Sequence, residues 1–203
     1  MKLFDYTIPR AFKEFQIRPE KGRVFLTDMD GVLFDWILSF EEYVWNNHPN
    51  PPKTKPEYNY DLGHWLEPDH PEKGYEFIRK YQVSEAAYKL EAFEDAVEFL
   101  PKIAEMGFDF VGVSSSGIID GIPQARRALL DNNFPGLFSK MVLLEPGSSK
   151  VEVLGMFPPT YFCDDHEWHV SSARECGHTA FCIGDVDWED IYHHVKEDQL
   201  VKT

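Results

Sequence analysis

The chain alternates between short apolar runs and longer segments in which apolar residues recur at helical spacing. The apolar runs predict five strands, at residues 24–27, 108–113, 140–144, 160–163 and 179–183. The helical spacing predicts helices over residues 84–106, 123–132 and 168–176. Strands that alternate with helices are typical of an α/β fold with a parallel sheet. We therefore expect a Rossmann-like, doubly wound parallel sheet.

Residues 37–88 interrupt this alternation. The stretch holds six prolines among aromatic residues and histidines, and it shows no clear strand pattern. A connection of about fifty residues between neighbouring strands is too long for a plain crossover. We expect a small helical cap over residues 37–88, inserted after the first strand, and an α/β core formed by residues 1–36 and 89–203.

Carboxylates follow two of the predicted strands. Asp28 and Asp30 come directly after the first strand, and Asp164 and Asp165 follow the fourth. The carboxyl ends of parallel strands border the ligand crevice of an open sheet, so these acids converge if the two strands are neighbours. Carboxylate oxygens at such density suit Mg²⁺, which prefers oxygen ligands.

Groups suited to an anion stand nearby in the sequence. The second strand ends in Ser114 and Ser115, which offer hydroxyls and backbone N–H groups to a phosphate, and Lys150 is a candidate cation for the same anion. Each feature has an ordinary alternative: an Asp-x-Asp turn or helix cap, a serine-rich loop, a surface lysine. Their joint placement at or near strand ends favours a phosphoryl-transfer site.

This order of motifs resembles that of the haloacid dehalogenase superfamily of phosphatases. The opening segment, Thr27-Asp-Met-Asp-Gly-Val-Leu-Phe-Asp-Trp36, looks most like that of the 5'(3')-deoxyribonucleotidases, which also carry a small helical cap. The resemblance covers residues 22–36 and 91–183. The second motif departs from it, because Ser114-Ser115-Ser116 stands where those nucleotidases have threonine, serine and proline.

The resemblance implies a mechanism. Asp28 would be the nucleophile that forms an aspartyl-phosphate, and Asp30 the general acid and base. Mg²⁺ would be held by Asp28, the backbone carbonyl of Asp30 and Asp164, while Asp165 would hold a metal-bound water. A rival metal motif begins at Asp185, but it follows the fifth strand and lies farther beyond Lys150 than Asp164 does.

The same resemblance assigns phosphate binding to Ser114, the Ser115 amide and Lys150. The implied substrate is a deoxynucleoside or ribonucleoside monophosphate. Five aromatic residues could stack on its base, although core packing is the ordinary alternative for each. They are Phe34, Trp36, Tyr43, Trp45 and Trp65.

Two other functions stay open. The chain could be a phosphatase of the same superfamily that acts on a sugar phosphate or another small metabolite, because the cap selects the substrate there. It could also be a binding or regulatory protein that keeps the fold without turnover. The complete set of acidic residues argues against this last reading.

Charge and cysteine content narrow the partners and the compartment. Thirty-five acidic against twenty basic residues give a net charge of -15, which disfavours nucleic-acid polymers and anionic membranes as partners. Cys163, Cys176 and Cys182 lack Cys-x-x-Cys spacing, and residues 1–20 do not resemble a signal peptide. We expect a cytoplasmic protein, a monomer or a homodimer, that binds a small phosphorylated molecule.

Overall fold

The computed structural model describes residues 11–13, 23–56, 61–119 and 121–201. Within them, a six-stranded sheet has the order β1-β4-β3-β2-β5-β6. Its strands are β1 (Ala11–Lys13), β2 (Arg23–Thr27), β3 (Phe108–Ser114), β4 (Phe138–Leu144), β5 (Tyr161–Asp164) and β6 (Thr179–Cys182). Strands β2 to β6 are parallel to one another, which confirms the predicted fold class. The short edge strand β1 pairs antiparallel with β4 and was not predicted.

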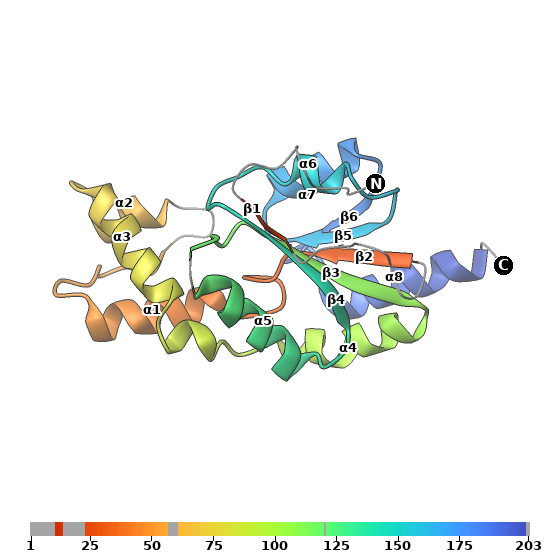
Figure 1. The fold of residues 1–203 in the computed structure, drawn as a ribbon, viewed down its shortest axis with the longest axis horizontal. Helices are drawn as coiled ribbons and strands as arrows, with labels where there is room; N and C mark the ends of the chain where they lie inside the picture. The colour runs from red at the N-terminus through yellow and green to blue at the C-terminus, as the bar shows by residue number, and fades with distance from the viewer. Residues whose placement is uncertain (1–10, 14–22, 57–60, 120, 202–203) are drawn as a thin grey trace.

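Helices cover both faces of the sheet (Figure 1). One face carries α4 (Glu94–Glu105), α5 (Ile122–Asn133) and α8 (Trp188–Val201). The other carries α6 (Val151–Leu154) and α7 (Glu167–Glu175). None of the helices in the described ranges is both long and apolar enough to cross a bilayer.

Alternate residues of the central strand β2 serve the two faces. Phe25 is fully buried on the side of α4 and α8, where its ring stacks on Tyr161 at 5.6 Å and contacts Trp188 at 5.9 Å. Val24 and Leu26 point to the opposite side and join the core under α6 and α7. Because β2 is buried on both faces, the backbone that follows it is held firmly at the carboxyl end of the parallel strands.

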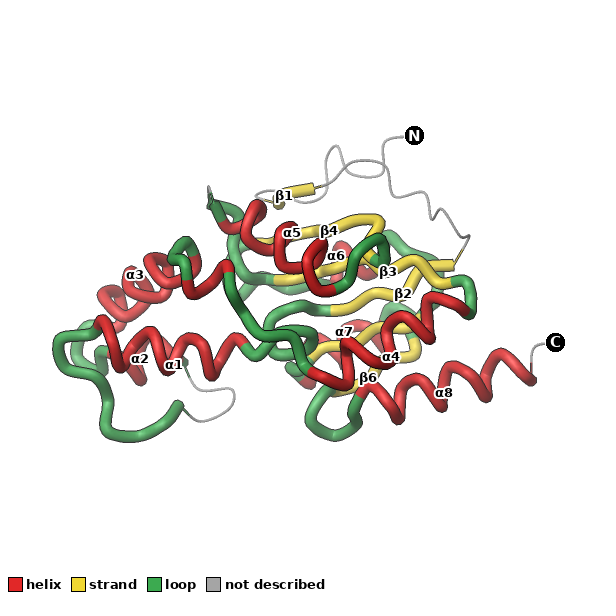
Figure 2. Tube along the Cα trace, turned by 90° about the horizontal axis from the view of Figure 1, so that it is seen from below, coloured by secondary structure: helices red, strands yellow, loops and turns green. Residues whose placement is uncertain are grey.

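A group of helices connects β2 to β3. It consists of α1 (Trp36–Asn47), α2 (Leu62–Leu66), α3 (Pro71–Gln82) and the short 3-10 helix η1 (Ala86–Tyr88), and we call it the helical group. Figures 1 and 2 show its α-helices to one side of the sheet. Tyr81 is fully buried at its centre, in ring contact with Trp36, Phe40 and Tyr43.

The helical group lies where the sequence predicts the cap, and the division into cap and core remains a prediction. Residues 1–10, 14–22 and 57–60, which belong to the predicted core and cap, lie outside the described residues.

One long predicted helix is wrong. Residues 84–106 form η1 and α4 with an extended linker between them. In this linker the Glu91 carbonyl accepts a hydrogen bond from the Asp35 N–H at 2.9 Å, and the Phe93 N–H donates to the Leu33 carbonyl at 2.9 Å. The linker backbone therefore pairs with the segment after Asp30 instead of continuing a helix. Helix α8 was not predicted either.

Candidate active site

Asp28 is the first residue beyond β2. Its N–H donates to the Cys163 carbonyl at 2.8 Å, which extends the pairing of β2 with β5 by one step. Its Oδ1 accepts the Met29 N–H at 2.7 Å, and its Oδ2 lies 2.7 Å from Nζ of Lys150. The carboxylate is therefore held through both oxygens, although 9% of the side chain stays exposed.

Lys150 is a buried cation between two carboxylates. It immediately precedes α6, its side chain is fully buried, and Nζ lies 2.6 Å from Oδ2 of Asp164. A lysine is almost never buried unless it is paired. Its charge is thus directed at Asp28 and Asp164 and not toward solvent.

Asp164 ends β5, and Asp165 follows it. The pairing of β2 with β5 makes the predicted first and fourth strands neighbours, as convergence of the acids requires. Carboxylate oxygens of Asp28, Asp164 and Asp165 all lie within 4.8 Å of one another. We call these three residues the acidic group.

Burial and charge act against each other here. Burial disfavours the charged form of Lys150, but the carboxylates of Asp164 and Asp28 outweigh it and raise the pKa of the ammonium. Burial also raises the pKa of Asp164 to about 7, although Lys150 opposes the shift. Two carboxylates contact this buried ammonium and Asp165 adds a third nearby, so a divalent cation would offset the excess negative charge.

Asp30 faces a different cation. Its Oδ2 accepts hydrogen bonds from Nε and Nη2 of Arg126 in α5, at 3.1 and 2.8 Å. Burial raises the pKa of Asp30, Arg126 opposes this, and the nearby Asp28 charge adds to it. A carboxyl group whose pKa is raised above its ordinary value holds a proton more readily, which suits acid and base chemistry.

Gly31 allows the first loop to approach Asp165. Its φ is +80°, which side chains rarely tolerate, and a Cβ atom there would lie 2.3 Å from Oδ2 of Asp165. The Gly in Asp-x-Asp-Gly is therefore needed both for the turn and for the space.

The serines lie at the end of β3, beside β2. Ser114 is 2% exposed, and the Ser115 hydroxyl donates to the Ser148 carbonyl at 3.0 Å, which ties this loop to the one before Lys150. Ser116 is also buried. Their assignment as phosphate ligands remains a prediction.

The five predicted stacking aromatics have different surroundings. Phe34 is fully buried in the core, so we do not retain it as a ligand contact. Trp36 and Trp65 are each 8% exposed and belong to the same core. Tyr43 is partly buried, whereas Trp45 is 51% exposed. Core packing thus accounts for most of these residues.

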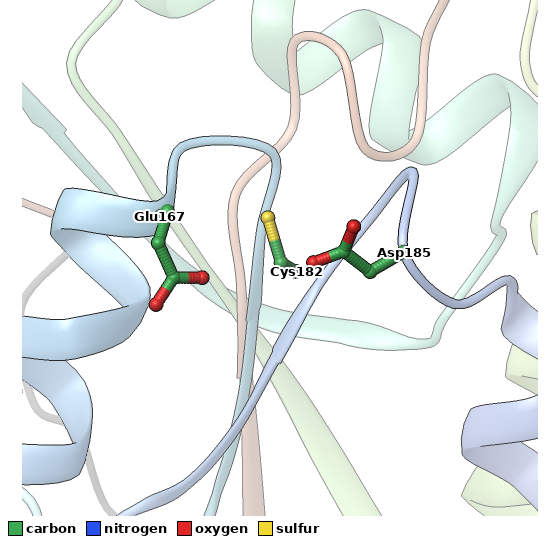
Figure 3. A group of neighbouring side chains, drawn as sticks. All are labelled: Glu167, Cys182 and Asp185. Atoms are coloured by element: carbon green, nitrogen blue, oxygen red, sulfur yellow. The ribbon is translucent and has the colours of Figure 1, made fainter.

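Asp185 lies in another cluster, with Glu167 and Cys182 (Figure 3). Cys182 stands between the two carboxylates, and burial together with Asp185 raises the pKa of its thiol to about 11. Glu167 already binds Arg174 at 2.8 Å. Of the two rival aspartates, the geometry groups Asp164 and not Asp185 with Asp28 in the part of the chain that the structure describes.

Three buried polar residues near the site were not predicted: Gln82, Arg126 and His169. Arg126 is fully buried, and a signal for it exists in the sequence. It falls four residues after Ile122 and four before Leu130, on the apolar stripe of α5. Gln82 and His169 carry no comparable signal.

The fold has relatives among solved structures. A haloacid dehalogenase-like hydrolase from Streptococcus pneumoniae superimposes with a TM-score of 0.55 at 14% identity, covering 79% of this chain and 83% of that chain. A hydrolase of the same superfamily from Ehrlichia chaffeensis gives 0.54 at 14% identity, covering 90% and 98%. A candidate phosphoglycolate phosphatase from Lactobacillus delbrueckii gives 0.53 at 15% identity, covering 85% and 98%. The chain therefore has the fold of haloacid dehalogenase-like hydrolases.

Sequence comparison adds less. No protein-family model matches the chain. An uncharacterised 32.4 kDa protein of bacteriophage T4, from the Gp30-rIII intergenic region, is 28% identical over an alignment of 169 residues, and the match covers 74% of this chain. The chain spans 56% of that relative's length.

Proposed function

We propose that this chain is a magnesium-dependent phosphomonoesterase that acts through an aspartyl-phosphate on Asp28. One observation carries the proposal: Asp28, at the end of the central strand, shares a buried lysine with Asp164 and lies beside Asp165. The fold and the order of the motifs support the same conclusion.

The acidic group fits Mg²⁺. This ion is held in proteins by one or two carboxylates together with waters and substrate phosphate oxygens. Asp28 and Asp164 would hold it directly and Asp165 through a bound water, with the backbone carbonyl of Asp30 as a further ligand by resemblance. When bound, Mg²⁺ would offset the charge of a phosphate monoester, which is close to a dianion at neutral pH.

Different residues of the site would carry out different parts of the reaction. A carboxylate oxygen of Asp28 attacks phosphorus, the bond from phosphorus to the ester oxygen breaks, and Asp30 donates a proton to that oxygen as the alcohol leaves. Asp30 then takes a proton from water as the water attacks phosphorus, and Asp28 leaves. Lys150, Ser114 and the Ser115 amide would stabilise the charge on the phosphoryl oxygens.

Nucleoside monophosphates are the first proposed substrates, on the strength of the opening motif. The burial of Phe34, Trp36 and Trp65 favours a second candidate, a small phosphorylated metabolite such as a sugar phosphate, because fewer rings remain to stack on a base. Exposed Trp45 stays available to either substrate.

The proposed setting is the cytoplasm, with the chain as a monomer or a homodimer. Cys163, Cys176 and Cys182 are all free thiols, which is the state expected in a reducing compartment.

The test is phosphate release from a panel of nucleoside monophosphates, sugar phosphates and p-nitrophenyl phosphate, with Mg²⁺ and with EDTA. We expect release that requires Mg²⁺ and that is abolished by Asp28→Asn. Asp185→Asn is the matched control, because it changes an aspartate outside the acidic group. Release from no ester, or full activity of Asp28→Asn, contradicts the proposal.

A further inference from the structure

Arg126 is a cation buried between the sheet and the helical group. Its side chain is fully buried, and it donates two hydrogen bonds to Oδ2 of Asp30. Its Nη2 also donates to Oε1 of Gln82 at 2.6 Å, and its Nη1 to the Ala87 carbonyl at 3.3 Å. Gln82 ends α3 and Ala87 lies in η1, so one guanidinium joins Asp30 to two elements of the helical group.

The two carboxylate oxygens of Asp30 differ in their hydrogen-bond partners. Oδ2 receives both bonds from Arg126, whereas buried Oδ1 has no hydrogen-bond partner among the described residues. A buried carboxylate oxygen normally has a partner. Arg126 thus fixes one oxygen, and the other, which none of the described residues bonds, stays open to a ligand.

The shape of the guanidinium explains why an arginine is suited to this position. Its N–H donors lie in one plane and form a rigid fork, so bonds on several sides fix both its position and its orientation. Gln82 is itself restrained, because its Oε1 also accepts the indole N–H of Trp36 at 3.4 Å. A chain of contacts therefore runs from the aromatic core of the helical group to Asp30.

We infer that Arg126 is a positioning residue that orients the Asp30 carboxylate toward the leaving group, and that Gln82 holds Arg126 in place. The inference rests on the proposed function, in which Asp30 protonates the leaving alcohol. Full burial separates Arg126 from solvent, so it acts through Asp30 and not on the phosphate directly.

Leaving-group dependence tests this role. An alkyl phosphate releases an alcohol that needs a proton, whereas p-nitrophenyl phosphate releases an anion that needs little help. In Arg126→Met we expect kcat to fall about 10- to 100-fold for the alkyl monophosphate that the wild type hydrolyses fastest. For p-nitrophenyl phosphate we expect a loss below about threefold, since general acid help matters little there.

The ratio of the two kcat values is the readout, because both are measured on one sample and the folded fraction cancels. Gln82→Met should shift the ratio in the same direction by less, and it keeps the test valid if Arg126→Met folds poorly. Arg126→Lys should restore the ratio only in part, since an ammonium group cannot make the several hydrogen bonds that a planar guanidinium makes. Arg127→Met is the matched control: this neighbour pairs with Asp131 and should leave the ratio unchanged.

A double mutant shows whether Arg126 acts through Asp30. In an Asp30→Asn background, Arg126→Met should change the ratio no further. An unchanged ratio in Arg126→Met, or an equal shift without Asp30, overturns the inference while the phosphatase activity stands. If the wild type releases phosphate from no ester, the proposed function itself fails and the role of Arg126 falls with it.

Discussion

Gly31 and Asp165 approach so closely that a Cβ atom on Gly31 would lie 2.3 Å from Oδ2 of Asp165. Gly31→Ala must therefore displace a carboxylate of the acidic group and also strain a backbone whose φ is +80°. We expect unfolding free energy to fall by about 1–3 kcal/mol and Mg²⁺ affinity to fall as well. Chemical denaturation and titration with Mg²⁺ measure the two effects.

Gly136→Ala is the control for this prediction. Gly136 has a similar φ of +73°, and nothing lies within 4 Å of its added Cβ. Gly136→Ala should lose stability through the same backbone strain and leave Mg²⁺ affinity unchanged. Equal Mg²⁺ affinity in both variants would contradict a role for Asp165 in the metal site.

Lys150→Met removes the ammonium that Asp28 and Asp164 share. Breaking a buried ion pair on one side costs about 3–5 kcal/mol, because the remaining charges stay buried. We expect a loss of stability on that scale, loss of phosphatase activity, and a larger stabilisation by Mg²⁺ than in the wild type. Thermal unfolding with Mg²⁺ and with EDTA checks this, and exposed Lys73 of α3 serves as the control. A stability change equal to that of Lys73→Met would refute it.

Asp30→Asn separates proton transfer from metal binding. The amide cannot donate and accept the proton as the carboxyl group does, so turnover should fall by about 10² to 10⁴. Mg²⁺ should still raise the unfolding temperature, because the acidic group is untouched. Asp28→Asn, in contrast, should lose both activity and most of this stabilisation. Normal turnover by Asp30→Asn would exclude Asp30 as the acid.

Buried His169 should make the protein less stable as the pH falls. Burial, helped by nearby Lys150, lowers the pKa of this imidazole to about 3, so the folded protein keeps it neutral. The unfolded chain binds a proton near pH 6.5, so stability is lost as the pH falls from about 6.5 toward about 3. The loss reaches about 2 kcal/mol at pH 5.

Urea unfolding at pH 7 and at pH 5 measures this contribution. In His169→Gln the difference between the two pH values should shrink by about 2 kcal/mol. His193→Gln changes an exposed histidine of α8 and should retain the full difference. If both variants behave alike, His169 is not the responsible group.

The predictability of the site differed from residue to residue. Asp28 and Asp164 could be predicted to meet, because each ends an apolar run and parallel strands share a carboxyl edge. The role of Arg126 could not be predicted, because it depends on a hydrogen bond to Asp30, which lies far away in the sequence. The break between η1 and α4 was missed for the same reason, since local helical spacing continues through Ala92, whose backbone pairs with Phe34.

The aromatic residues show a second limit. The sequence gives Trp36 and Trp45 the same chemical character, and both lie in one helix. Only the packing of α1 decides that Trp36 is 8% exposed and Trp45 51% exposed. Composition could therefore predict an aromatic-rich cap without telling core rings from exposed ones.

The central position of β2 in the sheet also determines when the site can assemble during synthesis. Asp28 and Asp30 are made before Lys150 and Asp164, which come from much later in the chain, although β2 is flanked by β3 and β5 in the sheet. Contacts between distant segments form slowly, because a long loop must close first. A nascent chain that has reached only β4 carries the proposed nucleophile without its cation or its neighbouring carboxylates. It should therefore be inert toward phosphate esters until β5 joins the sheet.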